Sequence, residues 1–142
     1  MKSLPESLIE IREHSGPDYQ PLIDYQNWRV AIINYTTDLT PDKINRMQKH
    51  TETDEVFVLM TGHCILFVGE GEKTVTKVHA VDMEPYKTYN IKRGVWHSHT
   101  FSEDARVLIV ENRDTVYENS PFAPLSIEQQ KEIVELTKKL WG

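Results

Sequence analysis

The sequence QKHTETDEVFVLMTG, residues 48–62, carries the strongest structural and chemical signals in the chain. It places His50 close to Glu55 and then enters an apolar run, Val56 to Met60, that ends beside Gly62. A run of β-branched and aromatic residues bounded by a glycine indicates a β-strand. Two metal-binding or acid-base side chains therefore stand where the chain enters a strand.

A second stretch, RGVWHSH at residues 93–99, supplies His97 and His99. Alternate residues of a strand point to the same side, so these two imidazoles share one face. If this stretch faces residues 48–62 in the fold, the side chains of both form a pocket. Any function of these side chains as one site depends on that meeting.

Size and charge exclude several classes of function. The 142 residues fit one domain, and the net charge of −6, from 22 acidic and 16 basic residues, argues against a nucleic-acid surface. The longest apolar runs, Val56 to Met60 and Val107 to Val110, are too short to cross a membrane. The charged N-terminal segment is unlike a secretory signal. The single cysteine, Cys64, is expected to be buried and favours a reducing, cytoplasmic location.

Short segments with strand patterns follow one another along most of the chain. Residues 15–25, which contain Gly16, Pro17 and Pro21, are predicted to be a loop, and residues 69–72 a hairpin turn. This pattern predicts an all-β antiparallel sandwich or barrel. The predicted strands are 7–14, 28–35, 44–50, 55–60, 64–68, 74–83, 86–91, 96–101 and 105–111.

The C-terminal part changes character. After a barrel at about 7–114 and a linker at 115–125, a helix is predicted over residues 126–141. Ser126 and Gln129 have the spacing of a capping box, and Lys138 and Lys139 suit the last turn. We expect this helix to dock on the barrel or on a partner subunit.

His50, Glu55 and His97 are the candidate metal ligands. Two imidazoles and a carboxylate suit zinc, iron, nickel or manganese and leave positions open for water or substrate. Gln48, on the same strand face as His50, is a candidate fourth and weaker ligand, and His99 could replace His97 or support it. The alternative is a hydrogen-bonded polar cluster that holds no metal.

Arg46, Phe57 and His99 are the candidate substrate-binding residues. Arg46 shares a strand face with Gln48 and is expected to form an internal salt bridge with Glu55 or a neighbouring acid. The alternative is that its guanidinium binds a substrate carboxylate. The remaining polar and aromatic candidates are expected to have no direct role in a site. His14, His63 and His79 are expected at the surface, Glu52 and Asp54 as solvated loop acids, and Trp96 in the core or at a dimer contact.

The order His50, four residues, Glu55, six residues, Gly62 resembles the second half of the first cupin motif. Gly94 followed two residues later by His97 resembles the core of the second cupin motif. The resemblance implies a single-domain, RmlC-like cupin jelly-roll barrel with its site in the barrel mouth. The chain departs from the family pattern at four positions, which have Gln48 for His, Tyr86 for Gly, Lys92 for Pro and Phe101 for Asn.

A narrower resemblance links Arg93 to His97, with Tyr89 four residues before, to the segment that precedes the active-site histidine of ureidoglycolate lyases. These are cupin-fold enzymes of purine breakdown. The resemblance implies the same fold and lyase chemistry as a reaction class.

Three functions follow as hypotheses. The first is a metal-dependent lyase, isomerase or epimerase acting on a small polar acid or sugar, with His99 or Glu55 moving a proton. The second is a metal-free module that binds a small ligand, which the replacement of histidine by Gln48 favours. The third is a scaffold whose terminal helix docks a partner. A homodimer is expected in each case, since cupins commonly pair and apolar edge strands need covering.

Overall fold

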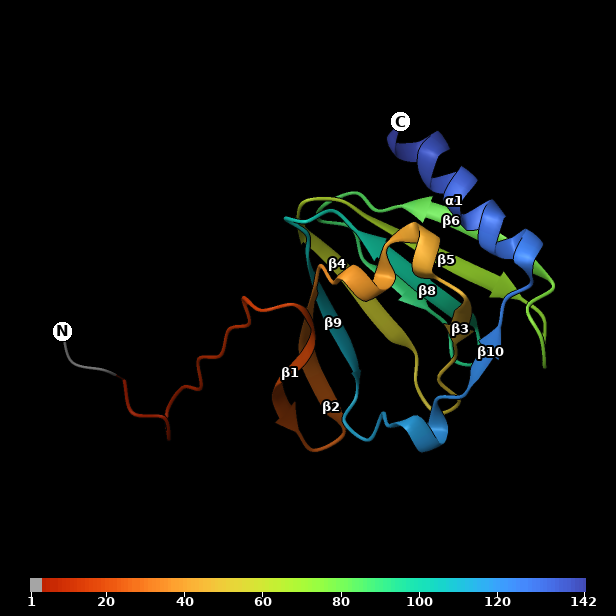
Figure 1. The fold of residues 1–142 in the computed structure, drawn as a ribbon. Helices are drawn as coiled ribbons and strands as arrows, with labels where there is room; N and C mark the ends of the chain where they lie inside the picture. Colours follow the sequence, from red (N-terminus) through yellow and green to blue (C-terminus); the bar gives the residue numbers. More distant parts are fainter. Residues whose placement is uncertain (1–3) are drawn as a thin grey trace.

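The structure, a computed structural model, describes residues 4–142 and contains two antiparallel five-stranded sheets (Figure 1). In the first sheet the order is β1 (Asp18–Tyr25), β2 (Trp28–Asn34), β9 (Arg106–Asn112), β4 (Glu55–Thr61) and β7 (Tyr89–Ile91). In the second it is β10 (Phe122–Pro124), β3 (Arg46–Gln48), β8 (Trp96–Phe101), β5 (Cys64–Glu70) and β6 (Lys77–Asp82). The predicted all-β architecture is confirmed.

The main core lies between the two sheets. Because successive strand residues point to opposite faces, every second residue of β2, β4 and β9 is directed inward. These inward residues are large and apolar, and the cluster they form with β5 and β8 holds the sheets together. It includes Ala31, Ile33, Phe57, Leu59, Leu66, Phe101, Val107 and Ile109.

Helix α1 (Ile127–Trp141) covers the outer face of the second sheet, beside β6 (Figure 1). Its buried Ile133 joins a second apolar cluster with Met47, Phe67 and Trp96, so Trp96 is a core residue. The predicted capping box is present, with Ser126 Oγ accepting from the backbone N–H of Gln129 at 3.1 Å. No helix among residues 4–142 is long and apolar enough to span a membrane.

The prediction is wrong at the N-terminal edge of the first sheet. Residues 7–14 form no strand, and β1 lies instead within residues 15–25, which were predicted to be a loop. Pro21 misled the prediction because it interrupts a strand pattern. In β1 it is tolerated, since an edge strand can leave one side without backbone donors and the register shifts just after Pro21.

Several predicted boundaries also need correction. The linker contains η3 (Tyr117–Asn119), a 3-10 turn, and β10, which pairs with β3 at the edge of the second sheet. The strand expected over 86–91 begins only at Tyr89, and the one over 44–50 shrinks to β3. The hairpin turn after β5 starts at Gly71 and not at Gly69. Gly69 is still part of the strand and is buried, and an added Cβ there would lie 2.9 Å from the side chain of Val75.

Tyr86 stands where the cupin pattern has glycine, and its backbone keeps the left-handed conformation that favours glycine, with φ of 68°. Its side chain is 98% exposed and therefore contributes little packing. A residue with a Cβ pays roughly 1–2 kcal/mol in this conformation.

Replacing Tyr86 with glycine should therefore raise the free energy of unfolding by about 0.5–1 kcal/mol, after the entropic cost of glycine is subtracted. Chemical denaturation measures the change. Thr88→Gly, two residues along the same exposed loop, is the matched control and should destabilise the protein. A Tyr86→Gly variant no more stable than Thr88→Gly would contradict the assignment of strain.

Candidate metal centre

The two stretches that carry the candidate ligands meet, as predicted. The backbone N–H of Gly94 donates to the carbonyl of His50 at 2.8 Å. The carboxylate of Asp54 accepts from the backbone N–H of Arg93 at 2.7 Å, so this loop acid anchors the second stretch although it is exposed. These bonds join segments about forty residues apart at one end of the barrel.

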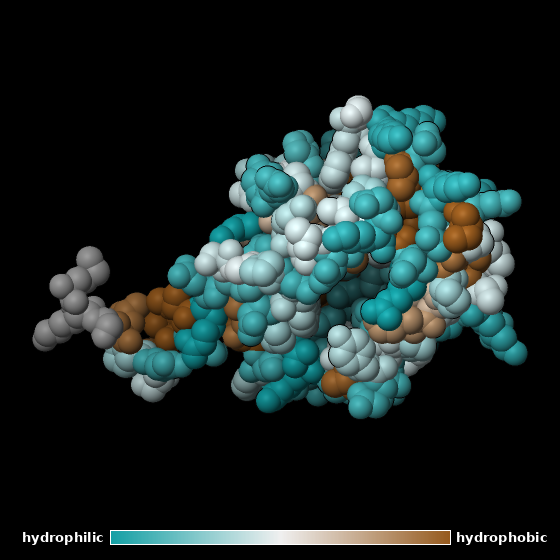
Figure 2. Space-filling view, in the orientation of Figure 1, coloured by the Kyte–Doolittle hydropathy of each residue, from teal (hydrophilic) through white to brown (hydrophobic). Residues whose placement is uncertain are grey.

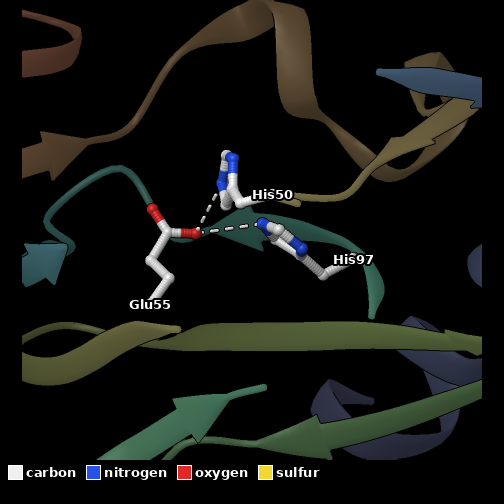
Figure 3. A group of neighbouring side chains, drawn as sticks. All are labelled: His50, Glu55 and His97. Carbon is white, nitrogen blue, oxygen red and sulfur yellow. Dashed lines mark hydrogen bonds and ion pairs between the residues drawn. The ribbon is translucent and has the colours of Figure 1, made fainter. Parts of the chain in front are cut away.

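His50, Glu55 and His97 converge on one point (Figure 3). One carboxylate oxygen, Oε1 of Glu55, lies 3.1 Å from Nε2 of His50 and 3.0 Å from Nε2 of His97. All three residues are buried, and their ligand atoms lie within 4.8 Å of one another. Glu55 opens β4, His97 lies in β8, and His50 lies in the loop between β3 and β4, two residues after β3 ends.

The far side of each imidazole is also held. Nδ1 of His50 lies 2.7 Å from the hydroxyl of Ser120, and Nδ1 of His97 lies 3.1 Å from the carbonyl of Val95. A carbonyl oxygen can only accept, so His97 carries a proton on Nδ1 and directs Nε2 toward Glu55. Such outer partners fix the orientation of ligating histidines.

The charges of the three side chains depend on one another. Burial would raise the pKa of Glu55, but the hydrogen bonds and charges of His50 and His97 outweigh it and bring that pKa well below its usual range. Burial would likewise lower the pKa of His97, yet Glu55 outweighs it and the pKa of His97 is raised. Glu55 and His97 therefore each favour the charged form of the other.

A cavity of about 990 Å³ opens next to this cluster. Figure 2 shows a recess near the centre of the visible face, with mostly hydrophilic residues around it. The volume is at the upper end of the range of small-molecule sites. Residues of both sheets and of the segment before β10 line it, among them Tyr19, Lys43, Arg46, Gln48, His50, Glu55, His97, His99, Glu111, Tyr117, Ser120 and Phe122.

Gln48 and His99 both line the cavity but lie outside the three-residue cluster. The side-chain amide of Gln48 donates to the carbonyl of Ser120 at 3.0 Å. Both ring nitrogens of His99 are buried and without a hydrogen-bond partner in the described chain. Burial, with a smaller contribution from His97, lowers the pKa of His99 to about 4, so its ring is neutral at pH 7.

Phe57 does not reach the cavity wall. Its fully buried ring packs between His97 and His99, with ring centroids at 6.3 and 5.8 Å. This position suits support of the imidazoles rather than direct contact with a ligand.

Arg46 corrects another expectation, since none of the ion pairs found among residues 4–142 involves it. Its guanidinium lies over the ring of Phe122, 3.7 Å from the centroid. The internal salt bridge fails because Arg46 is exposed at the cavity rim, whereas Glu55 is buried and bonded to imidazoles.

Glu111, Tyr19 and Ser120 are cavity residues that the sequence analysis missed. Glu111 is only 6% exposed and accepts a hydrogen bond from the hydroxyl of Tyr19. Period-two alternation places Glu111 on the same inward face as Val107 and Ile109, and a carboxylate at that position was a readable signal. Tyr19 and Ser120 fell in stretches predicted to be loop and linker.

The donor set fits a divalent transition metal. Two imidazole nitrogens and a carboxylate oxygen, each free to face a common point, are the ligands that zinc, iron, nickel and manganese take in sites with open positions. The fold and the cluster together define a small jelly-roll protein with a candidate His-Glu-His metal centre in its mouth.

Comparisons with known proteins agree with the jelly-roll fold. No protein-family profile matches the chain, and no curated protein matches it in sequence. Among solved structures, it is similar to Pac13 of Streptomyces, described as a unique nucleoside dehydratase, with a TM-score of 0.57 and 6% identity over 83% of this chain and 89% of that one. It is also similar to the QdtA 3,4-ketoisomerase of Thermoanaerobacterium thermosaccharolyticum, with a TM-score of 0.52 and 15% identity over 80% and 75%.

A cupin-2 domain protein of Shewanella frigidimarina matches with a TM-score of 0.47 and 20% identity over 76% of this chain and 88% of that one. The chain has the fold of a small, RmlC-like cupin jelly roll. At these identities the likeness concerns the fold alone.

The pH dependence of stability should report on Glu111. Burial, followed by the charge of Glu55, raises the pKa of Glu111 to about 8. The unfolded carboxyl ionises near its ordinary pKa of about 4.3, so between that pH and about 8 the folded state binds the extra proton and stability falls as pH rises.

Glu111→Gln removes this titration. The melting temperature of the metal-free variant minus that of metal-free wild type should therefore become more positive from pH 5 to pH 8. Glu103→Gln, which removes a carboxylate from an exposed loop, is the control. A difference between Glu111→Gln and wild type that stays constant over this range would contradict the raised pKa.

Proposed function

We propose that this protein is a divalent-metal-dependent enzyme of the lyase or isomerase type that acts on a small polar acid or sugar. One observation carries the proposal: the His50, Glu55 and His97 cluster stands at the wall of a cavity large enough for such a molecule. A polar cluster with a purely structural role would not need an adjoining cavity of this size.

His50, Glu55 and His97 would hold the metal, and Gln48 is a weaker candidate because its amide already donates to Ser120. When bound, a divalent cation would polarise a carbonyl or hydroxyl of the substrate. The side chains of Ser120 and Phe57 keep the imidazoles in place for this task.

Other cavity residues would bind and orient the substrate. Arg46 and Lys43 supply positive charge at the rim for a carboxylate or phosphate. His99 offers one donor and one acceptor that have no partner within the described chain. Glu111 accepts a hydrogen bond from Tyr19 and lines the same cavity as the three candidate metal ligands. It would exchange a proton with the bound molecule.

The solved structures of similar fold support the reaction class. Pac13 is a nucleoside dehydratase that has been solved with uridine, and the ketoisomerase has been solved with TDP. Dehydration and ketoisomerisation both move a proton next to a polarised oxygen function. In this cavity the candidate metal ligands would polarise the oxygen and neighbouring side chains would move the proton.

A metal-free binding module is the second candidate. Gln48 replaces a histidine ligand, and the ion pairs of Glu55 with the two imidazoles already compensate its charge without a cation. In that case the cavity would bind a small ligand without turnover.

We also propose that the protein works as a homodimer in the cytoplasm. The homodimer is supported by a row of half-buried aliphatic side chains on the outer face of the first sheet, which includes Val30, Val110 and Val56. The location is supported by the single buried Cys64.

Metal binding by the wild-type protein and a His97→Gln variant tests the proposal. His97 is only 4% exposed, so glutamine, which is closer in size to histidine than alanine is, limits the loss of packing. We expect one metal ion per wild-type chain. The metal affinity of the variant should be at least about a hundredfold lower, because the loss of even an outer-shell partner typically lowers metal affinity about 10–100-fold. Elemental analysis gives the stoichiometry, and calorimetry with Zn²⁺, Ni²⁺ and Mn²⁺ gives the affinity.

His79→Gln is the matched control, since His79 is exposed and pairs with Glu70 away from the cavity. It should bind metal as wild type does. Wild-type protein that takes up no metal at micromolar concentrations would favour the metal-free module.

The anion-binding role of Arg46 can be tested with a ligand panel. Thermal shifts with small hydroxy acids, keto acids, neutral sugars, uridine and TDP should identify binders. Arg46→Gln should weaken binding of the acidic compounds by roughly tenfold, a typical effect of losing a charged hydrogen bond, and leave neutral ones unchanged. Arg106→Gln, outside the cavity, is the control. Equal losses for acidic and neutral ligands would contradict the role.

A further inference from the structure

The hydroxyl of Ser120, which holds the outer nitrogen of His50, has a second partner of its own. Oγ of Ser120 lies 2.7 Å from Nδ1 of His50 and 3.1 Å from Oδ1 of the Asn119 amide. Ser120 is only 2% exposed, so its single proton has to be used within the protein. Whether that proton points to His50 or to Asn119 decides which nitrogen of the His50 ring carries a proton.

The orientation of the Asn119 amide is fixed at both of its ends. The backbone N–H of Val116, which can only donate, points to Oδ1 at 3.0 Å. At the other end, Nδ2 donates to a carboxylate oxygen of Glu52 at 3.0 Å and to the backbone carbonyl of Asp114 at 2.9 Å. Exchanging the amide oxygen and nitrogen would break each of these bonds. The atom that faces Ser120 is therefore the amide oxygen.

This orientation determines the direction of the hydrogen bond to His50. An amide oxygen can only accept, so the bond between Asn119 and Ser120 uses the proton of the Ser120 hydroxyl. The hydroxyl then has only lone pairs left for His50, and Nδ1 of His50 has to be the donor. His97 reaches the same state through a backbone carbonyl. In both rings the outer nitrogen holds a proton, and Nε2 faces Glu55 (Figure 3).

Glu55 attracts the proton of the His50 ring in the opposite direction. Its Oε1 lies 3.1 Å from Nε2 of His50, and a carboxylate is a strong hydrogen-bond acceptor. A proton on Nε2 would occupy the lone pair that a metal needs, because histidine binds a metal through an unprotonated nitrogen. The bonds of Ser120 and Asn119 oppose this by stabilising the proton on Nδ1.

We propose that Glu52, Asn119 and Ser120 form a hydrogen-bond relay that keeps the proton of the neutral His50 ring on Nδ1 and leaves Nε2 free to bind a metal. They are positioning residues, since none of them belongs to the cluster of candidate ligands. Glu52, expected to be only a solvated loop acid, is exposed but orients the Asn119 amide. The relay deepens the proposed metal site, and its effect on metal affinity rests on that proposal.

The position of the ring proton of His50 in the metal-free protein tests the relay. Long-range proton–nitrogen NMR correlation spectra show which ring nitrogen carries the proton. Spectra recorded up to about pH 10 include the neutral ring, since histidine ordinarily titrates at about pH 6.5. Wild type should carry the proton on Nδ1. Asn119→Ala frees the Ser120 proton to point at His50, so the ring proton should move to Nε2, beside Glu55; His50→Gln identifies the signals.

Calorimetry with Zn²⁺ measures the consequence for metal binding. Asn119→Ala should lower the affinity by about tenfold, at the lower end of the effect of an outer-shell partner. The double variant Asn119→Asp, Glu52→Gln exchanges the amide and the carboxylate. Position 119 then still accepts from Ser120, and position 52 donates to position 119. This double variant should restore both the position of the ring proton and the wild-type affinity.

Thr51→Val is the matched control. The Thr51 hydroxyl donates to the backbone carbonyl of Asn119 at 3.0 Å, so this variant loosens the same segment without removing the relay, and the proton should stay on Nδ1. Three results would each overturn the relay: a wild-type ring with its proton on Nε2, an Asn119→Ala ring like that of wild type, or a Thr51→Val ring like that of Asn119→Ala. The wild-type spectrum requires no variant to fold. Wild type that binds no metal would contradict the proposed function, whereas the ring proton of His50 would still decide the relay.

Discussion

The buried carboxylate of Glu55, bonded through one oxygen to His50 and His97, is the interaction on which the rest of the site depends. A buried charge is costly unless it is paired, and here the partners come from two stretches far apart in the sequence. The carboxylate and its imidazoles thus require the loops before β4 and β8 to lie side by side. The same geometry gives the three atoms a common point at which a cation can replace the shared protons.

Two apolar clusters support this interaction. The core between the sheets fixes β4 and β8 and brings Phe57 against the imidazoles, so that the ring positions are set by packing. Helix α1 and its cluster close the outer face of the second sheet. The cavity side stays polar: the hydroxyl of Tyr19 donates to Glu111, and the hydroxyl of Ser120 is hydrogen-bonded to His50. A rigid frame around a polar recess is what binding or catalysis at a metal centre needs.

The sequence predicts the features that rest on local chemistry and strong periodicity. The strand at Trp96–Phe101, the capping box at Ser126 and the meeting of His50, Glu55 and His97 belong to this group. Prediction from the sequence fails where tertiary context outweighs local signals. Pro21 is compatible with β1 only because that strand is at an edge, and β10 is a strand only because β3 pairs with it. Arg46 could not be placed because its position over Phe122 depends on that pairing.

Anomalous diffraction from a crystal of the metal-loaded protein tests the central claim most directly. The account predicts one anomalous peak at about 2.0–2.2 Å from Nε2 of His50, Nε2 of His97 and Oε1 of Glu55, with at least one further position open to the cavity. A peak at another place, or an intact hydrogen-bonded cluster with no peak at saturating metal, would contradict it.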